Sequence, residues 1–499
     1  MEKTKKIREK KEPTFLLAVL PIVAMILLLG IGYAILGLSA EVLMLVSAAV
    51  AAVIAIYLGY TWDDIMDSIV SKLSKTMPAI FILIIVGFLI GTWMIGGTIP
   101  MMVYYGLKII NPSFLVVTAF LVTAIVSICT STSWGSAGTI GVALMGIASG
   151  LGAPLPIVAG AVVSGAYFGD KMSPLSDTTN LAPIAAGSKL YDHIAHMLWT
   201  TGPGFIICCI VYTVVGMNLD GLSGATPEKV STILDTLHQI FSFNPLIVLP
   251  IIIVLYGSIR KKPTIPVMLI SSTVAMFNGV VFQGFKLADC FNAAIGGFKL
   301  DMIQKAGFDA ANLIPDIPTL LQRGGMLSML STVLIAFCAY GFAGTLAVTG
   351  SLDIVLNRIM KSVKSTFGLI FSTIVSCITA VFVTSNGQLS ILIPGEMFHS
   401  TYVKRGLEPR NLSRTLEDAA TVIEPITPWT AADVYMATTL GVPTLSYLPW
   451  ACLNYTGIIF AMIWAATGIG IMKIKKGSEN YAEYVALNKA DGIDVEAGQ

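Results

Sequence analysis

Thr-Ser-Thr-Ser-Trp-Gly-Ser at residues 130–136 and Gly-Asp-Lys-Met-Ser-Pro-Leu-Ser-Asp-Thr-Thr-Asn at residues 169–180 bound the stretch around which this chain is organised. Both segments adjoin apolar sequence, yet they carry hydroxyl groups, two aspartates and the helix breakers Gly and Pro. At membrane depth such residues are tolerated only where protein or a water-filled cavity surrounds them. We interpret the stretch from Thr130 to Gly187 as half of an ion-binding site inside a membrane.

A second copy of this stretch begins at Thr384, which aligns without a gap with Thr130. Several polar positions and several Gly and Pro positions match in kind. Ser131 aligns with Ser385, Gly141 with Gly395, Gly152 with Gly406, Asp170 with Glu424, Ser173 with Thr427, Pro174 with Pro428 and Gly187 with Gly441. The register indicates a duplicated chain whose second half supplies the rest of the site.

The composition is that of a membrane protein. Hydrophobic residues make up 55% of the 499 residues, charged residues 12%, and the mean hydropathy is +0.81, which predicts a polytopic all-α protein. A net charge of +1 gives no reason to expect a nucleic-acid partner. No Walker A motif is present, so we expect transport driven by ion gradients, with no cofactor. The seven cysteines have no metal-ligand spacing and are interpreted as packing residues.

Membrane topology follows from apolar runs and basic loops. Lys and Arg are concentrated in residues 1–13, in the turn at 260–262 and after residue 472, and these segments are expected inside the cell. A short amphipathic helix at 61–76, capped by Thr61, is expected to lie along the membrane surface. Segments 136–150 and 155–168 are interpreted as half-helices or re-entrant segments. Spans are expected at about 15–37, 41–60, 77–98, 113–129, 193–217, 245–258, 264–282, 326–350, 366–383 and 445–471.

The basic loops also orient the two halves. The first half begins inside and ends outside, and the second does the reverse, so two inverted repeats with 12 to 14 membrane elements are expected. We divide the chain into a cytoplasmic N-terminus (1–13), a first repeat (14–217), an external linker (218–244), a second repeat (245–472) and a cytoplasmic polar tail (473–499). The tail has no predicted role. We expect a multi-pass protein of the bacterial cell membrane with both termini inside the cell.

The two interrupted stretches offer oxygen ligands of the kind that Na⁺ prefers. We place Na⁺ at Asp170, Asp177 and Asn180. Burial raises the pKa of a carboxylate and a bound cation lowers it, so one carboxylate can hold either H⁺ or Na⁺. The complete candidate set for the ion or substrate is Asp170, Asp177, Thr178, Asn180, Ser131, Thr132, Ser173, Ser385, Asn386, Glu424, Thr427 and Asp433.

Structural roles compete with these assignments. Asp170 and Asp177 are alternatively interfacial, paired with Lys171 or Lys189, and Lys171 itself suits either a carboxylate partner or an anionic substrate. Arg410 and Arg414 are close enough in sequence to neutralise Glu424 and Asp433. The hydroxyl groups are alternatively bonded to backbone carbonyls.

The quoted motifs resemble a known family. Gly165 to Ala182, the preceding Thr132 to Gly141 segment and the Glu424-Pro-Ile-Thr-Pro-Trp-Thr block are similar to the NhaC family of bacterial Na⁺/H⁺ antiporters. The resemblance implies a secondary transporter with Asp170, Ser173, Asp177, Thr178 and Asn180 in or near the transport path. Relatives in that family include malate/lactate exchangers and amino-acid transporters, so the motif supports Na⁺ coupling better than any organic substrate.

We therefore predict a Na⁺/H⁺ antiporter that works by alternating access. The alternative is a Na⁺- and H⁺-coupled exchanger of organic acids or amino acids, because half-helix N-termini and serine hydroxyls can bind a carboxylate without arginine. The expected partners are the lipid bilayer, Na⁺, H⁺ and, in that alternative, a small carboxylate or amino acid. A passive channel fits interrupted helices less well. An intramembrane enzyme is not expected because no His-Glu-x-x-His motif is present.

Overall fold

The computed structural model describes residues 10–33, 35–219, 227–260, 262–305, 308, 313–314, 316–361, 363 and 365–490. Within these residues the regular structure is helical, and the one β-bridge pairs Leu407 with Lys473. Eight helices are long and apolar enough to cross a membrane, or up to ten if each of two bent helix pairs is one span. The predicted class, an all-α multi-pass membrane protein, is confirmed.

The helices of the first half lead into and out of the interrupted stretch. They are α1 (Phe15–Leu27) with the π-helical η1 (Leu28–Tyr33), α2 (Ala40–Tyr57), α3 (Trp62–Ile95), α4 (Thr98–Ile109), η2 (Pro112–Phe114), α5 (Leu115–Thr130), α6 (Ser133–Ser136), the π-helical η3 (Ala137–Gly141), α7 (Val142–Gly150), α8 (Leu155–Met172), α9 (Asp177–Ala186) and α10 (Leu190–Met217).

In the second half more helices precede the interrupted stretch than in the first half. Its helices are α11 (Pro227–Ile240), η5 (Pro245–Val248), α12 (Leu249–Ile259), α13 (Thr264–Val281), α14 (Leu287–Gly296), η6 (Leu300–Met302), α15 (Asp316–Leu321), η8 (Met326–Met329), α16 (Leu330–Ala347), α17 (Ser351–Lys361), α18 (Thr366–Thr384), α19 (Gly387–Lys404), α20 (Pro409–Leu416), the π-helical η9 (Glu417–Thr421), η10 (Glu424–Ile426), α21 (Ala431–Leu440), α22 (Thr444–Tyr447), η11 (Leu448–Trp450), α23 (Cys452–Thr467) and α24 (Tyr481–Ala490).

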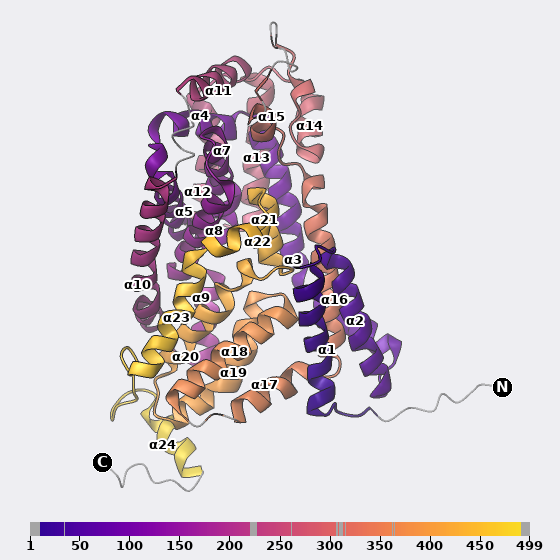
Figure 1. Cartoon of the computed structure of the whole chain (residues 1–499), viewed down its shortest axis with the longest axis vertical. Coiled ribbons are helices and arrows are strands. Elements are labelled where there is room, and N and C mark those ends of the chain that lie inside the picture. The colour runs from indigo at the N-terminus through magenta and orange to yellow at the C-terminus, as the bar shows by residue number, and fades with distance from the viewer. Residues whose placement is uncertain are drawn as a thin grey trace, which may run out of the picture.

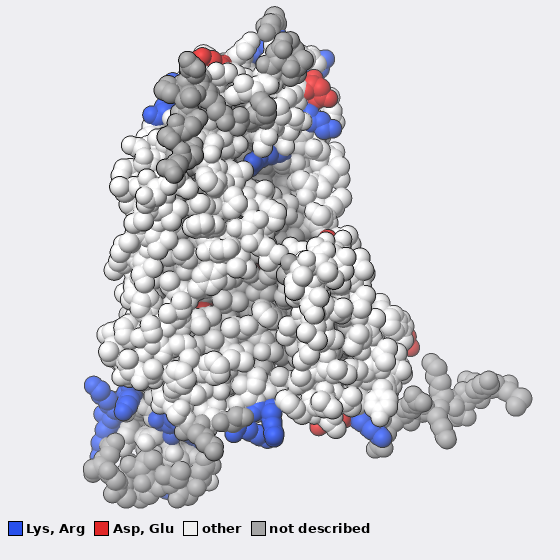
Figure 2. Space-filling model, viewed as in Figure 1, with Lys and Arg blue, Asp and Glu red and all other residues white. Residues whose placement is uncertain are grey.

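Charged residues gather at the ends of the molecule. In Figure 1 the start of α1 and helix α24 lie at the lower end, and α11, α14 and α15 lie at the upper end. Figure 2 shows a broad white belt between these ends, with most of the visible Lys and Arg side chains below it. Lys3, Lys5, Lys6, Arg8 and Lys261 belong to the basic segments expected inside the cell and lie outside the described residues.

Helix α3 corrects one prediction, because the expected surface helix and the following span form a single helix of 34 residues. Its start is as predicted: Thr61 Oγ1 accepts the N–H of Asp64 at 3.2 Å, and the Asp64 carboxylate accepts the N–H of Thr61 at 2.9 Å. The apolar face packs on α16, where the Ser68 hydroxyl donates to the Gly344 carbonyl at 2.7 Å. The helix continues through Pro78, Gly87 and Gly91 because membrane helices tolerate Pro and Gly where neighbouring helices pack against them.

Helix α8 is longer than the predicted segment at 155–168, because it continues to Met172 and has 18 residues. It packs closely on α5 through glycines. A Cβ atom at Gly165 would lie 2.3 Å from the Phe120 carbonyl oxygen, and one at Gly169 would lie 2.4 Å from Ser127 Cβ. This packing carries Asp170 and Lys171, at the end of α8, into the protein interior.

One predicted span is bent, and another is too short in the structure to cross a membrane alone. The predicted span at 245–258 contains α12, which has 11 residues, and a bend of 99° separates 245–257 from the linker helix at 230–240. The predicted span at 445–471 turns by 53° between η11 and α23. Pro449 lies in η11 and has no backbone N–H to continue the helical bonds.

The backbone adopts the same local conformation at matching positions of the two interrupted stretches. Ser131 and Ser385 both have left-handed backbones, with φ of 57° and 52°, which is uncommon for residues other than glycine. The next residues, Thr132 and Asn386, cap the helices that follow by accepting the N–H three residues on, at 3.3 Å and 2.9 Å. Helices α5 and α18 therefore each end, and a new helix starts, within two residues.

The polar tail contains a helix that docks on the rest of the protein. In α24, the Glu483 carboxylate accepts a hydrogen bond from His399 Nε2 at 2.8 Å, and His399 Nδ1 lies 2.7 Å from the Ala186 carbonyl oxygen. Nearby, the hydrogen bond from Lys189 to Glu479, at 2.6 Å, raises the pKa of Lys189.

Replacing Glu483 with alanine is expected to loosen α24. The contact is partly exposed, so its loss is worth about 0.5–1 kcal/mol, and the amides of residues 481–490 should exchange with solvent about two- to fivefold faster. Hydrogen-exchange mass spectrometry measures this directly. Glu479→Ala is the matched control because both members of its ion pair are more than two-thirds exposed. Unchanged exchange in Glu483→Ala would mean that His399 does not hold the tail.

Candidate functional site

A cavity of about 430 Å³ lies where the two interrupted stretches meet. Residues 130–135 of the first break and residues 386–388 of the second both line it. The predicted site residues on its wall are Ser131, Thr132, Asp170, Asp177, Thr178, Asn386 and Glu424. Polar residues that supply the remaining oxygen atoms are Thr130, Ser133, Tyr167, Ser176, Tyr340, Gln388 and Thr421, and the cavity also reaches Lys262 and Thr264.

Asp170 is a buried carboxylate on this wall, with 8% of its surface exposed. Ser133 Oγ donates to its Oδ2 at 2.8 Å, and the backbone N–H of Ser133 also bonds to it. Ser133 is the first residue of the helix that restarts after the break. The positive end of that helix therefore faces the negative carboxylate, which stabilises the charge.

Glu424 has the matching environment in the second half. Its carboxylate accepts the backbone N–H of Gly387, the first residue of α19. A Cβ atom at Gly387 would lie only 2.4 Å from Glu424 Oε2, so this approach requires glycine. Asp170 and Ser133 align with Glu424 and Gly387 in the proposed duplication, and each half thus aims a carboxylate at the start of its own interrupted helix.

Substituting Gly387 with alanine is expected to push Glu424 away from the helix start and weaken ion binding. A hydrogen bond to a charged group is worth about 1.5–3 kcal/mol, so the Na⁺ concentration for half-maximal transport should rise roughly tenfold or more. The measurement is Na⁺-dependent proton flux in proteoliposomes. Gly296→Ala is the control, since a Cβ atom at that helical glycine meets nothing within 4 Å. Equal Na⁺ dependence in both variants would contradict the role of this contact.

The first stretch brings Asp177 and Thr178 to the same cavity but not Asn180. Asp177 is exposed in the first turn of α9, and Thr178 shares a hydrogen bond of 3.2 Å with Ser176. The Asn180 amide donates to the carbonyls of Pro174 and Ser176 at 2.9 and 2.7 Å. Asn180 therefore holds the turn before α9, and of the three predicted Na⁺ ligands two line the cavity.

Three other predicted residues of the second stretch lie off the cavity wall. Asp433 accepts the N–H of Trp429 at 3.2 Å and the hydroxyl of Tyr447 at 3.1 Å, which closes the turn before α21. The Thr427 hydroxyl donates to a carbonyl of its own turn at 2.9 Å. Ser385 is buried, and its hydroxyl has no hydrogen-bond partner among the described residues.

Ser173 also lies off the wall, directly behind it. Its hydroxyl shares a hydrogen bond of 2.7 Å with Ser131 Oγ and donates to the Ile128 carbonyl at 3.2 Å. Ser173 thus ties the end of α8 to the break after α5. In the described part of the chain, no group of three or more His, Cys, Asp and Glu side chains is placed to hold a metal ion.

Comparison with known proteins identifies the family. The profile of the Na⁺/H⁺ antiporter family matches residues 165–469. The chain is 57% identical to an uncharacterized Na⁺/H⁺ antiporter of Haemophilus influenzae, over 93% of this chain and 98% of that protein. The chain belongs to the Na⁺/H⁺ antiporter family. The resemblance that the motifs carried is confirmed.

Two further relatives of this antiporter-family chain have more specific names. It is 36% identical to the Na⁺/H⁺ antiporter NhaC of Alkalihalophilus pseudofirmus, over 90% of this chain and 96% of that one. It is 35% identical to the malate-2H⁺/Na⁺-lactate antiporter of Bacillus subtilis, over 87% of this chain and 90% of that one. These relatives are transporters, and the protein is accordingly a membrane transporter and not an enzyme.

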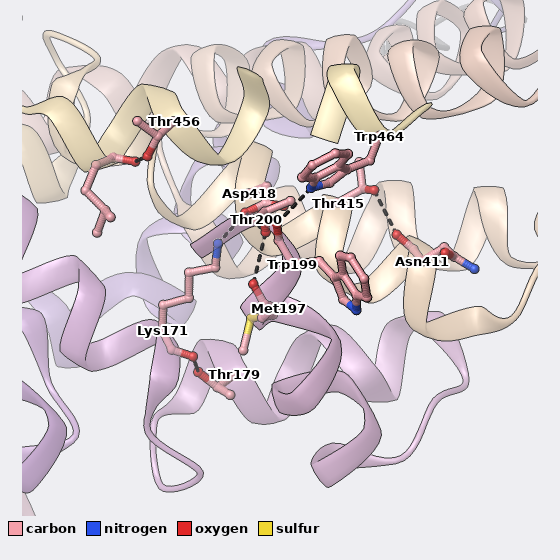
Figure 3. Close-up of polar contacts among 11 residues, drawn as sticks. Lys171, Thr179, Met197, Trp199, Thr200, Asn411, Thr415, Asp418, Thr456 and Trp464 are labelled. Atoms are coloured by element: carbon pink, nitrogen blue, oxygen red, sulfur yellow. Dashed lines mark hydrogen bonds and ion pairs between the residues drawn. The ribbon is translucent and has the colours of Figure 1, made fainter. Parts of the chain in front are cut away.

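A buried ion pair joins the first half of the chain to the second. Figure 3 shows Lys171, at the end of α8, reaching Asp418 in η9, and Lys171 Nζ donates to Asp418 Oδ1. Thr200 of α10 donates to the same oxygen at 3.1 Å. The side chains of Lys171 and Asp418 are 2% and 0% exposed. The open alternatives are thereby decided: Lys171 pairs with Asp418 and Lys189 with Glu479, so neither lysine neutralises Asp170 or Asp177.

The remaining candidate partners also have structural contacts. Arg414 is fully buried and its Nη1 donates to the Gly470 carbonyl at 3.1 Å, so its described contacts do not include Glu424 or Asp433. Trp134 stacks on Tyr435 with ring centres 4.6 Å apart. Trp429 meets Phe382 edge to face, with ring centres 5.4 Å apart. Both tryptophans therefore pack against another aromatic ring.

Several residues near the site were not predicted from the sequence. Tyr167 and Tyr340 line the cavity, and Glu417 begins η9, whose last residue, Thr421, also lines it. Tyr167 precedes Asp170 by three residues on α8, a spacing that predicts a shared helix face. Glu417 directly precedes Asp418 at membrane depth, where an acidic residue itself signals function. Nothing in the sequence around Tyr340 links it to either break.

Proposed function

We propose that this protein exchanges Na⁺ for H⁺ across the bacterial cell membrane by alternating access, with the two ions competing for the carboxylates of the central cavity. The observation that carries the proposal is the convergence of both interrupted stretches on one cavity. Asp170, Asp177 and Glu424 line it together with hydroxyl and amide oxygens. Such ligands suit Na⁺, and the carboxylates bind H⁺ in its place. No resident cofactor is required.

The charges of the cavity favour a cation over an organic anion. Among the described residues that line it, Lys262 is the one cationic side chain, and no arginine is present. The helix starts that would bind a substrate carboxylate already face the protein's own Asp170 and Glu424. An incoming anion would have to displace them, at the cost of leaving buried carboxylates without donors.

The second candidate is a Na⁺- and H⁺-coupled exchanger of small organic acids or amino acids. Its support is the volume of about 430 Å³, which exceeds the space that a single ion needs, and the similarity to the malate-2H⁺/Na⁺-lactate antiporter. In that case the same carboxylates bind the coupling ions, and Lys262 and Thr264 at the cavity margin are the groups available to a substrate carboxylate.

We propose further that the chain consists of two inverted repeats, at 14–217 and 245–472, joined by an external linker at 218–244. The matched left-handed serines and the matched caps of Thr132 and Asn386 support the duplication. The Lys and Arg side chains at the end that carries α24 support a cytoplasmic location for that end, with 1–13 and 473–499 on the same side. The linker includes α11.

Transport in proteoliposomes with a pH dye inside tests the function. The first step adds Na⁺ alone, and the second adds Na⁺ with malate, lactate or amino acids trapped on the opposite side. Proton movement with Na⁺ alone is the result that plain antiport predicts. Proton movement that requires a trapped organic solute would replace this proposal by the coupled exchanger, and no proton movement in either arm would reject both.

A further inference from the structure

Glu417 is a fully buried carboxylate in η9. It begins the π-helical η9, its side chain is fully buried, and neither Oε1 nor Oε2 has a partner among the described residues. Thr421, four residues later, is the hydrogen-bonding side chain nearest in kind to this carboxylate, but its hydroxyl and the Glu417 oxygens do not meet in hydrogen-bond geometry, and the hydroxyl has no other partner among the described residues. Buried polar groups are nearly always satisfied, so two adjacent exceptions of this kind call for a ligand.

No cationic side chain in the described part of the chain forms an ion pair with this carboxylate. Lys171 interacts with Glu417 electrostatically, but its ammonium group donates to Asp418. Arg414, three residues earlier, directs Nη1 to the Gly470 carbonyl, its Nε and Nη2 have no partner among the described residues, and its charge interacts with Asp418 and Tyr402. An uncompensated buried charge costs several kcal/mol. A mobile cation or a proton must therefore accompany Glu417.

One residue of the Glu417 and Thr421 pair lies on the cavity wall. Thr421 lines the cavity wall, while Glu417 lies on the first residue of the same π-turn. Asp170 interacts electrostatically with both Glu417 and Glu424, so the three carboxylates belong to one group of interacting charges. π-Helical turns are frequent at functional sites.

We propose that Glu417 and Thr421 form an inner Na⁺ position behind the cavity, which an ion occupies after passing Asp170 and Glu424. This inference rests on the proposed Na⁺ transport. The ligands are a carboxylate oxygen, a hydroxyl oxygen and backbone carbonyls of the irregular segment, all of which are hard oxygen donors. Asp418, the residue after Glu417, is paired with Lys171 and is therefore not a second ligand for the same ion.

The test is Na⁺ binding and transport by Glu417→Gln in the full-length protein. Radioactive ²²Na⁺ binding to purified protein reads the site directly, and Na⁺-dependent proton flux in proteoliposomes reads its role. We expect the half-saturating Na⁺ concentration to rise at least about tenfold in both assays. Unfolding temperature without Na⁺ should be unchanged or higher, because the substitution removes an unpaired charge. Glu396→Gln, exposed on α19, is the matched control.

A second pair of variants covers the case in which Glu417→Gln does not fold. Thr421→Val should raise the half-saturating Na⁺ concentration in the same direction, and Thr421→Ser should restore it, since only the hydroxyl is proposed to bind. Wild-type ²²Na⁺ affinity in Glu417→Gln, or in Thr421→Val, would overturn the inner position. Absence of Na⁺/H⁺ exchange by the wild-type protein is a separate outcome that rejects the proposed function, while the binding assay still decides whether Glu417 holds Na⁺.

Discussion

Asp170→Asn is expected to abolish Na⁺-driven proton movement or to shift it to much higher Na⁺ concentrations, while the protein still inserts in the membrane. The carboxylate lies on the cavity wall, receives the Ser133 hydroxyl at 2.8 Å and faces the start of α6. An asparagine has the same size but neither binds a proton nor attracts a cation by charge. Losing an interaction of about 1.5–3 kcal/mol weakens Na⁺ binding about 10- to 150-fold.

The controls for Asp170→Asn separate its charge from its position. Asp192→Asn changes an exposed aspartate at the start of α10 and should have no effect. Asp177→Asn should produce a smaller shift than Asp170→Asn, because Asp177 is exposed and water screens its charge. The readout is the Na⁺ dependence of proton flux in proteoliposomes. Near-normal transport by both Asp170→Asn and Asp177→Asn would reject the assignment of this cavity as the ion site.

Lys171→Met and Asp418→Asn are each expected to destabilise the protein strongly. Each substitution leaves the other charge buried without its partner, which costs about 3–5 kcal/mol. The loss should appear as a lower unfolding temperature in detergent and a lower yield of folded protein. Thr200 remains hydrogen-bonded to Asp418 in the lysine variant, but a neutral hydroxyl does not compensate a charge.

The double variant Lys171→Met with Asp418→Asn is the informative comparison. Removing both charges eliminates the desolvation cost of each, so the double variant should be more stable than either single variant. Additive losses would mean that the two side chains act independently and that their contact contributes little. If the double variant folds and still transports Na⁺, the pair serves the structure of the site rather than ion exchange.

The amino-acid sequence by itself determined the class of protein and the chemistry of its two special segments. Hydropathy predicts membrane helices because each span must bury its own backbone bonds in lipid. The sequence also predicts the Ser-rich breaks and their carboxylates as special segments, because acidic residues at membrane depth are energetically costly. The repeated pattern led to Glu424 from Asp170 although the two residue types differ.

The tertiary structure decided which of these residues meet. Asn180 and Asp433 looked like ligands, but their polar atoms are used within turns. Lys171 finds Asp418 in the other half of the chain, a contact that depends on how α8 packs against η9 and not on any local pattern. Helix α3 runs through a predicted boundary because packing on α16 occupies its apolar face. Neighbouring residues determine which ligand groups and helix breaks a segment carries. Which distant charges pair is determined only by the packing of whole helices.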